Sequence, residues 1–172
     1  AVRRITVQDK NGRTLVEFPL YAGVLGALFI GSWTVLALIA AWRLNPLCLA
    51  LSPIAIFVLL GYSDTKRFTW AAHLALGLAL AGAPLGAWIA VTGSFAATPF
   101  VLAGVVVTWV AGFDILYALQ DETFDRARGL ASVPARFGTV AALAISAVLH
   151  LGTLALLAML PGVYPPGLGP AY

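Results

Sequence analysis

The sequence has little charge and almost no sulfur. Of its 172 residues 10% are charged, with seven acidic side chains against ten basic ones, and it contains a single cysteine, Cys48. One cysteine excludes a disulfide bond within the chain. The low charge, together with a hydrophobic content of 61%, excludes an ordinary soluble globular protein. The mean hydropathy of +0.95 indicates an integral membrane protein that lies in a lipid bilayer.

Long apolar runs divide the chain into segments that predict membrane-spanning helices. A helix rises 1.5 Å per residue, so about 20 apolar residues cross the hydrocarbon core of a bilayer. Residues 1–18 are too polar for that core, and we expect an interfacial loop there. Gly82 and Gly86 have the four-residue spacing typical of closely packed membrane helices. The sequence therefore predicts a single all-α domain over residues 1–172, a polytopic bundle with five spans at residues 20–42, 47–62, 71–91, 99–119 and 139–160.

The basic residues distribute unequally between the two faces of this five-span bundle. One face has Arg43 alone. The other has nine cations, namely Arg3, Arg4, Lys10, Arg13, Lys66, Arg67, Arg126, Arg128 and Arg136. Because positive loops stay in the cytoplasm, we expect the second face to be the cytoplasmic and active face of a bacterial inner membrane. Cations at helix ends also explain the net charge of +3, so no nucleic-acid partner is expected.

Four of the seven acidic residues lie in one stretch, residues 112–138. Asp114, Asp121 and Asp125 are spaced by seven and four residues, which would place them on one face of a continuous helix. Carboxylate oxygens suit Mg²⁺, which usually takes one or two of them together with phosphate oxygens of a substrate. Asp114 also ends a long apolar run, where an ionisable side chain is costly and indicates function. We therefore expect a metal–diphosphate site here; the alternative is a solvated loop of balanced charges.

The pattern D-x-x-Y-A-x-x-D-x-x-x-D, which begins at Asp114 and includes Tyr117, resembles the second aspartate-rich motif of the UbiA-type intramembrane aromatic prenyltransferases. The continuation GLASVPARFG is similar to that family as well. Within the family, FDILYALQD is most similar to the 4-hydroxybenzoate polyprenyltransferases and to the prenyltransferases of the futalosine menaquinone route. The resemblance implies Mg²⁺ at Asp121 and Asp125. It also implies that Asp114 and Tyr117 belong to the catalytic group.

The loop GYSDTKRFT resembles the Y-x-x-x-K-R loop of the same family. The resemblance implies that Tyr62, Lys66 and Arg67 bind the diphosphate, with Lys66 also counted among the catalytic residues. A cationic pair stabilises the charge that develops on a departing diphosphate. We expect these residues to converge on the aspartate motif, although the pair could also serve only as cytoplasmic anchors. Asp64 departs from the apolar or aromatic residue expected in this loop.

The first aspartate-rich motif of the family has no clear match in this sequence. The segment NGRT at residues 11–14 resembles the N-P-R-T segment that follows that motif. Arg4 and Gln8, however, stand where its aspartates would fall, and Asp9 is one residue out of register. The resemblance therefore implies a partial chain that corresponds to the middle of the family fold. We expect the activity of the chain alone to be impaired.

Two functions of different classes remain open at this point. The resemblance implies an enzyme that transfers a polyprenyl group from a polyprenyl diphosphate to an aromatic acid in ubiquinone or menaquinone biosynthesis. The acceptor is either 4-hydroxybenzoate or a naphthoate-type acid. The alternative is a catalytically inactive membrane fragment, or an ion- or proton-conducting bundle in which Asp114 is a relay. A relay does not need Lys66 and Arg67 on the carboxylate side, which favours the enzyme.

The two histidines of the sequence, His73 and His150, both lie within predicted spans. A lone histidine in an apolar helix is more often a hydrogen-bonded packing residue than a catalyst. We therefore assign neither histidine a functional role from the sequence. The sequence does not indicate an oligomeric state.

The charge asymmetry predicts the membrane topology. Reporter fusions at Thr14, Ser94 and Tyr172 should show Thr14 in the cytoplasm and the other two positions outside, because five spans separate the ends of the chain. A fluorescent protein that matures only in the cytoplasm and a phosphatase that is active only outside it would measure this in parallel. A phosphatase signal at Thr14 would overturn the arrangement.

Overall fold

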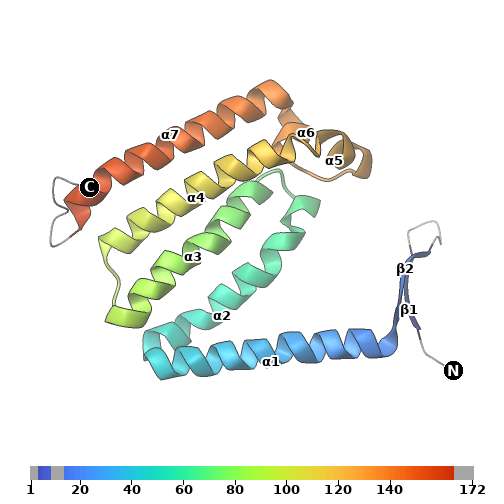
Figure 1. Cartoon of the computed structure of the whole chain (residues 1–172), viewed down its shortest axis with the longest axis horizontal. Helices are drawn as coiled ribbons and strands as arrows, with labels where there is room; N and C mark the ends of the chain where they lie inside the picture. The colour runs from blue at the N-terminus through green and yellow to red at the C-terminus, as the bar shows by residue number, and fades with distance from the viewer. Residues whose placement is uncertain (1–3, 9–13, 165–172) are drawn as a thin grey trace. The chain divides into compact units, whose positions relative to one another are not determined.

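The computed structural model describes residues 4–8 and 14–164, and the chain separates into two compact units, residues 1–43 and 44–172 (Figure 1). The first unit begins with an antiparallel hairpin of β1 (Arg4–Gln8) and β2 (Thr14–Pro19), which pairs Val7 with Val16. Helix α1 (Leu20–Leu44) follows directly. The expected loop over residues 1–18 is therefore wrong for residues 4–8 and 14–18, and the rest of that range lies outside the described residues. The β-branched residues of RITVQ favour the strand that the sequence argument overlooked.

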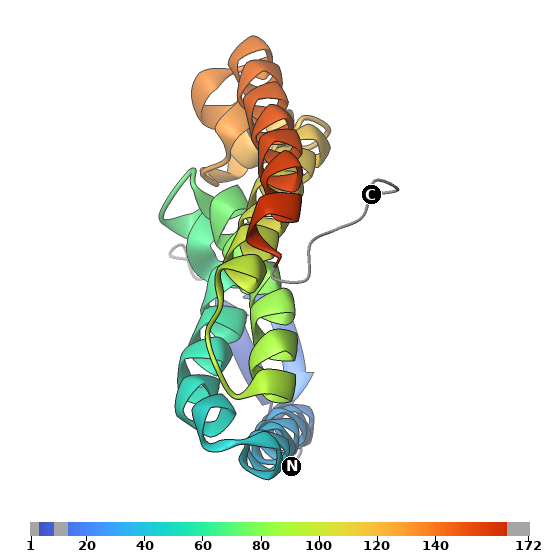
Figure 2. The same ribbon diagram turned by 90° about the vertical axis from the view of Figure 1, so that its left-hand side faces the viewer.

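The second unit is a layer of long helices with short ones at one end. Helix α4 lies between α3 and α7, and α2 flanks α3 (Figures 1 and 2). The elements of this unit are α2 (Pro46–Gly61), η1 (Tyr62–Arg67), α3 (Ala72–Thr92), α4 (Ala97–Ala118), α5 (Glu122–Arg128), α6 (Val133–Phe137) and α7 (Thr139–Val163). Helices α3, α4 and α7 are long and apolar enough to cross a membrane, and α2 is a shorter apolar helix.

The helical bundle predicted from the sequence is confirmed as the fold class. The five long helices begin and end within three residues of the expected ranges. The short helices α5 and α6 were not predicted, because the polar return after α4 gives no periodic apolar signal. The division of the chain into one membrane domain with these five crossings stays a prediction.

Asn45 fixes the start of α2 against the end of α3. Its side-chain oxygen accepts a hydrogen bond from the Cys48 amide at 2.9 Å, and its side-chain nitrogen donates to the Ile89 carbonyl at 2.8 Å. The first bond is an N-cap, and Pro46 after it has the φ that the first helical turn needs. A single polar side chain thus satisfies backbone groups of two helices in apolar surroundings.

Small residues allow α4 to pack closely on both neighbours. A Cβ added at Gly77 of α3 would lie 2.7 Å from the Val107 carbonyl oxygen of α4. A Cβ added at Gly112 of α4 would lie 2.8 Å from the His150 ring of α7. The Ser146 hydroxyl donates to the Gly112 carbonyl at 2.8 Å across the second contact. Close backbone approach of this kind is how membrane helices gain packing and interhelical hydrogen bonds.

The close packing that we expected at Gly82 and Gly86 is not observed. No described atom lies within 4 Å of a Cβ built at either position. Both glycines instead line an apolar cavity of about 860 Å³ formed by residues of α2, α3 and α4, including Val58 and Phe100. The four-residue spacing is therefore present, but the helix contact lies at Gly77, nearly one and a half turns earlier in α3.

The contrast between these glycines gives a stability prediction. Gly77→Ala should destabilise the chain by about 1–3 kcal/mol, because the methyl group would meet backbone atoms of α4 that cannot move independently. Thermal unfolding in detergent would measure the change. Gly86→Ala is the matched control in the same helix and should be neutral or slightly stabilising, since alanine has the higher helix propensity. Equal effects of the two substitutions would contradict the packing described here.

Candidate functional site

The three aspartates of the predicted motif do not lie on one continuous helix. Helix α4 ends at Ala118 and α5 begins at Glu122. In the turn between them the backbone amide of Asp121 bonds to the Ala118 carbonyl at 3.2 Å, which is the tighter spacing of a helix end. Asp114 thus belongs to α4, Asp121 precedes the first turn of α5, and Asp125 lies within α5. The expected single helical face is wrong, because the polar turn interrupts the helix.

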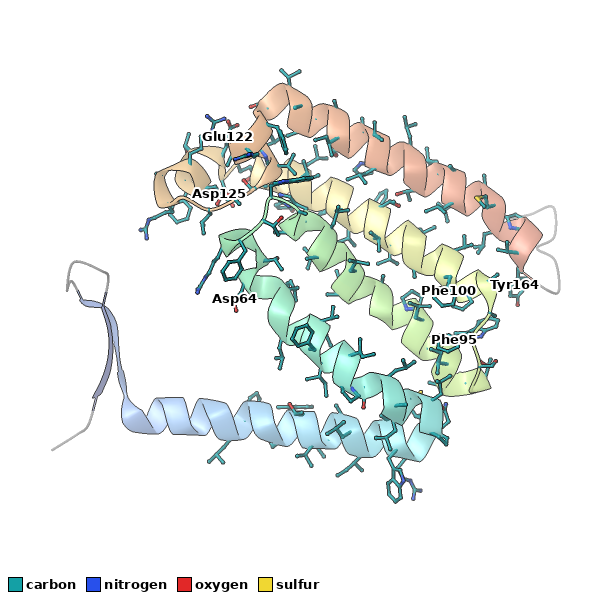
Figure 3. All side chains as sticks on the ribbon, turned by 180° about the vertical axis from the view of Figure 1, so that it is seen from behind. Asp64, Phe95, Phe100, Glu122, Asp125 and Tyr164 are labelled. Carbon is teal, nitrogen blue, oxygen red and sulfur yellow. The ribbon has the colours of Figure 1, made fainter. Side chains whose placement is uncertain are left out.

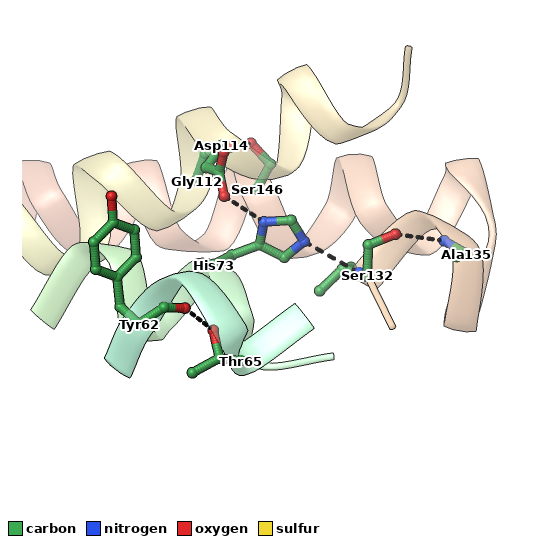
Figure 4. A network of polar contacts seen from close by, with 9 residues as sticks. Tyr62, Thr65, His73, Gly112, Asp114, Ser132, Ala135 and Ser146 are labelled. Atoms are coloured by element: carbon green, nitrogen blue, oxygen red, sulfur yellow. Dashed lines mark hydrogen bonds and ion pairs between the residues drawn. The ribbon is translucent and has the colours of Figure 1, made fainter. Parts of the chain in front are cut away.

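Asp114 is bound by a histidine that sequence reasoning did not assign to the site. The Nδ1 atom of His73, in the first turn of α3, lies 2.7 Å from Oδ2 of Asp114 (Figure 4). The His73 side chain is 1% exposed, whereas the Asp114 side chain is 31% exposed. A buried imidazole therefore holds one oxygen of a carboxylate that is still accessible. The available signal was position, since His73 follows the Lys66 loop and so lies at the same end of the bundle as Asp114.

The second ring nitrogen of His73 reaches the segment after α5. The amide of Val133, the first residue of α6, donates to Nε2 of His73 at 3.2 Å. Ser132 caps α6 by accepting from the Ala135 amide at 3.3 Å, and Ser132 and Val133 are both buried. His73 thus connects α3, α4 and the start of α6 at one point (Figure 4).

Asp121 and Asp125 lie one helical turn apart at the start of α5. Asp125 is only 2% exposed, whereas Asp121 is exposed. Helix α5 ends at Arg128, the φ of +67° at the following Gly129 favours glycine, and the Leu130 amide bonds back to the Asp125 carbonyl at 2.9 Å. This C-cap fixes the backbone that carries the buried carboxylate.

The described residues contain no group of three or more His, Cys, Asp or Glu side chains suited to a metal ion. Mg²⁺ does not need such a group, because it commonly takes one or two carboxylates together with substrate phosphates. Asp121 and Asp125 have the oxygen donors that this mode of binding requires. The residues present therefore fit a hard divalent cation that arrives with a phosphate ligand, and the metal assignment stays a prediction.

Glu122, the fourth acid of the stretch, has a structural role. Its carboxylate forms an ion pair with Arg126 at 2.8 Å and accepts a hydrogen bond from the Thr139 hydroxyl at 2.9 Å. Arg126 also donates to the Pro134 carbonyl at 3.5 Å. These contacts connect α5 to α6 and to the start of α7. The charges that an ordinary solvated loop would leave free are used here to fix the loop.

The predicted diphosphate residues lie in or beside η1. Arg67 forms an ion pair with Asp64 at 3.4 Å, and both side chains are largely exposed. Tyr62 is half-buried, and its carbonyl accepts a hydrogen bond from Thr65 (Figure 4). The side chain of Lys66 lies outside the part of the chain that the structure describes. Convergence of these residues on Asp121 and Asp125 therefore stays a prediction.

Tyr117 lies on the exposed side of α4, where its ring contacts Phe113 edge to face with centroids 4.9 Å apart. Its predicted catalytic role is not tested by this contact. The labelled acids share one end of the second unit: Asp64, Glu122 and Asp125 lie there, and Phe95 and Phe100 lie at the opposite end (Figure 3). The η1 segment and α5 are therefore at the same end of the helices.

Comparison with known proteins gives a consistent result. Residues 18–172 match the UbiA prenyltransferase family. The chain is 36% identical over 165 residues to a 4-hydroxybenzoate solanesyltransferase of Synechocystis, which covers 91% of this chain and 51% of that protein. It is 34% identical over 163 residues to a 4-hydroxybenzoate octaprenyltransferase of Vibrio campbellii, which covers 92% of this chain and 57% of that protein.

A solved structure is similar as well. The apo structure of a UbiA homologue from Aeropyrum pernix K1 superposes with a TM-score of 0.72 at 33% identity, over 78% of this chain and 52% of that one. The chain thus spans about half the length of the curated relatives and of the solved structure that it matches. The resemblance of the chain to this family is confirmed, and the roles of the aspartates stay predictions.

Proposed function

This chain belongs to the UbiA prenyltransferase family, and on that premise we propose that its site transfers a polyprenyl group from a polyprenyl diphosphate to 4-hydroxybenzoate. The observation that carries the proposal is the accessible Asp114 carboxylate, held by a buried histidine at the helix end where α5 presents two more aspartates. The names of relatives at 34–36% identity support the acceptor. The active face is then cytoplasmic, at a bacterial inner membrane.

The proposed reaction breaks the bond between the allylic carbon and the diphosphate oxygen, and the electron pair leaves with the diphosphate. The ring carbon ortho to the acceptor hydroxyl then supplies the electrons of the new carbon–carbon bond. Loss of the proton from that ring carbon restores aromaticity. Asp114 orients the acceptor through its hydroxyl or takes the proton, since its carboxylate has both a fixed orientation and access from outside.

The diphosphate lies between charges of both signs. Tyr62, Lys66 and Arg67 bind its oxygens, because donors aimed at a leaving group stabilise the charge that develops there. Asp121 and Asp125 would hold the divalent metal that the family generally uses, which we assign as Mg²⁺. When bound, this ion neutralises diphosphate charge. Tyr117 follows Asp114 by one turn and completes the catalytic group.

The first test concerns activity. The unmodified chain should be nearly inactive, because Arg4 and Gln8 stand where the first motif would supply carboxylates. A chimera that carries the family's first aspartate-rich motif ahead of α1 should transfer the polyprenyl group to 4-hydroxybenzoate, and only with Mg²⁺. Changing Asp121 and Asp125 to Asn in the chimera should lower the rate by more than ~10²-fold, the typical cost of one stabilising group. Prenylated product in detergent would be measured by chromatography.

The matched control is Arg128→Gln, a charge change on the exposed side of the same helix, where the guanidinium lies over the Phe124 ring. It should leave the rate nearly unchanged. A chimera that binds both substrates without forming product would contradict the proposal. Such a result would favour the inactive bundle, and ion flux in liposomes would then separate the inactive fragment from a conductor. Full turnover by the unmodified chain would contradict the role given to the first motif.

A second test uses the ion pair between Asp64 and Arg67. Asp64→Asn should raise the affinity for inorganic diphosphate about two- to fivefold, because it removes a negative charge beside the ligand and releases Arg67; exposed pairs contribute at most about 1 kcal/mol. Calorimetric titration in detergent with Mg²⁺ would measure this. The double variant Asp64→Asn with Arg67→Gln should lose the gain. Weaker binding by Asp64→Asn alone would contradict the assignment of this loop.

A further inference from the structure

We propose that His73 is a positioning residue that holds Asp114 as an oriented carboxylate and connects it to the main chain of α6. The proposal is based on two contacts of the His73 ring, from Nδ1 to Asp114 at 2.7 Å and from the Val133 amide to Nε2 at 3.2 Å. The use of that carboxylate in prenyl transfer rests on the proposed function. The arrangement itself does not, and it can be tested separately.

The contact with Val133 determines which nitrogen carries the proton. A backbone N–H can only donate, so Nε2 of His73 must offer a lone pair. A neutral imidazole with Nε2 unprotonated carries its hydrogen on Nδ1, and Nδ1 faces Oδ2 of Asp114. His73 therefore donates to Asp114, which accepts as a carboxylate. A doubly protonated ring would place a second N–H against the N–H of Val133 and lose that bond.

The arrangement is rigid on the side of His73, which is buried, and accessible on the side of Asp114. His73 is 1% exposed, so water cannot replace either of its partners. The ring also cannot turn about its bond to Cβ without breaking both contacts. Asp114 keeps 31% of its side chain exposed. One carboxylate oxygen is thus fixed from the protein side, and the group remains reachable by an acceptor.

The bond to Val133 gives His73 a second task. Val133 is the first residue of α6, and the first amides of a helix have no acceptor within the helix. The Ser132 side chain already accepts from Ala135, so Nε2 of His73 is the acceptor for Val133. The segment that follows the aspartate pair of α5 is thereby fixed to the same imidazole that orients Asp114. The two halves of the proposed site share one positioning residue.

His150 shows what a packing histidine looks like in the same bundle. Its Nδ1 lies 2.7 Å from the Ser146 carbonyl of its own helix, and its ring packs edge to face against Trp109 at 5.3 Å. No carboxylate is among the contacts of His150 in the described part of the chain. It is therefore a matched control for substitutions at His73.

Two variants separate the bonds of His73. Asparagine can place an amide N–H near the position of Nδ1, and glutamine can place an amide oxygen near the position of Nε2. His73→Asn therefore keeps the donor to Asp114 and loses the acceptor for Val133, whereas His73→Gln does the reverse. Because each variant loses one hydrogen bond, a merely structural role would lower stability and activity similarly in both.

The activity arm uses the chimera that supplies the first aspartate-rich motif. We expect kcat to fall ~10²-fold in His73→Gln, the typical cost of a misplaced reacting group, and less than ~10-fold in His73→Asn. The KM for the polyprenyl diphosphate should change little in His73→Gln, since that variant keeps the bond to Val133 that fixes the segment after α5. His150→Asn and His150→Gln should retain the parent kcat. Equal losses of kcat in His73→Asn and His73→Gln would overturn the positioning role.

The second arm has a readout that does not depend on activity. Nitrogen-15 NMR of the histidine side chains in the 172-residue chain should show that Nδ1 of His73 carries a proton and that Nε2 carries none. Asp114→Asn should keep this tautomer, because the amide oxygen still accepts. A protonated Nε2 on His73 would overturn the inference. A wild-type chimera that makes no product would overturn the proposed function instead, and the NMR result would still decide the arrangement of His73.

Discussion

The close contact between α3 and α4 is the constraint on which the site depends. Gly77 lets the two backbones touch at Val107, and no larger residue fits there without displacing main-chain atoms. His73 lies one turn before Gly77, and Asp114 lies two turns after Val107. The glycine contact therefore sets the separation at which a short imidazole bridges the helices. In lipid, where apolar burial gives helices little reason to associate, such packing carries the geometry of the polar end.

The acidic side chains of residues 112–138 look alike in the sequence but have different contacts in the structure. Asp114 is held by His73, Glu122 is paired with Arg126 and accepts a hydrogen bond from Thr139, and Asp125 is buried within α5. Only Asp121 is plainly exposed. The carboxylate of Glu122 pairs with a cation of its own helix, whereas the carboxylate of Asp114 contacts an imidazole from α3 and stays partly exposed. Spacing along the chain could not make this distinction, because His73, the partner of Asp114, comes from α3 and Thr139, a partner of Glu122, comes from α7.

The long helices could be predicted because bilayer thickness fixes their length, and the aspartate motif could be found because its residue types are rare in apolar sequence. The turn after Ala118 could not be predicted, since a seven-residue spacing fits an unbroken helix equally well. His73 was missed for a related reason: nothing in a single sequence states which faces of α3 and α4 meet. For the same reason Gly82 and Gly86 were predicted to be the packing glycines, although Gly77 makes the contact.

In a folded protein the volume of a cavity and the packing of the helices around it are usually coupled. Beside α3 these two properties depend on different glycines. Gly82 and Gly86 line the cavity, and a Cβ built at either position lies more than 4 Å from every described atom of a neighbouring helix, whereas Gly77 carries the helix contact. A methyl group can therefore be added at Gly82 or Gly86 with little change in how the bundle assembles. The volume of the cavity can therefore change by single methyl groups while the polar end of the molecule stays unchanged.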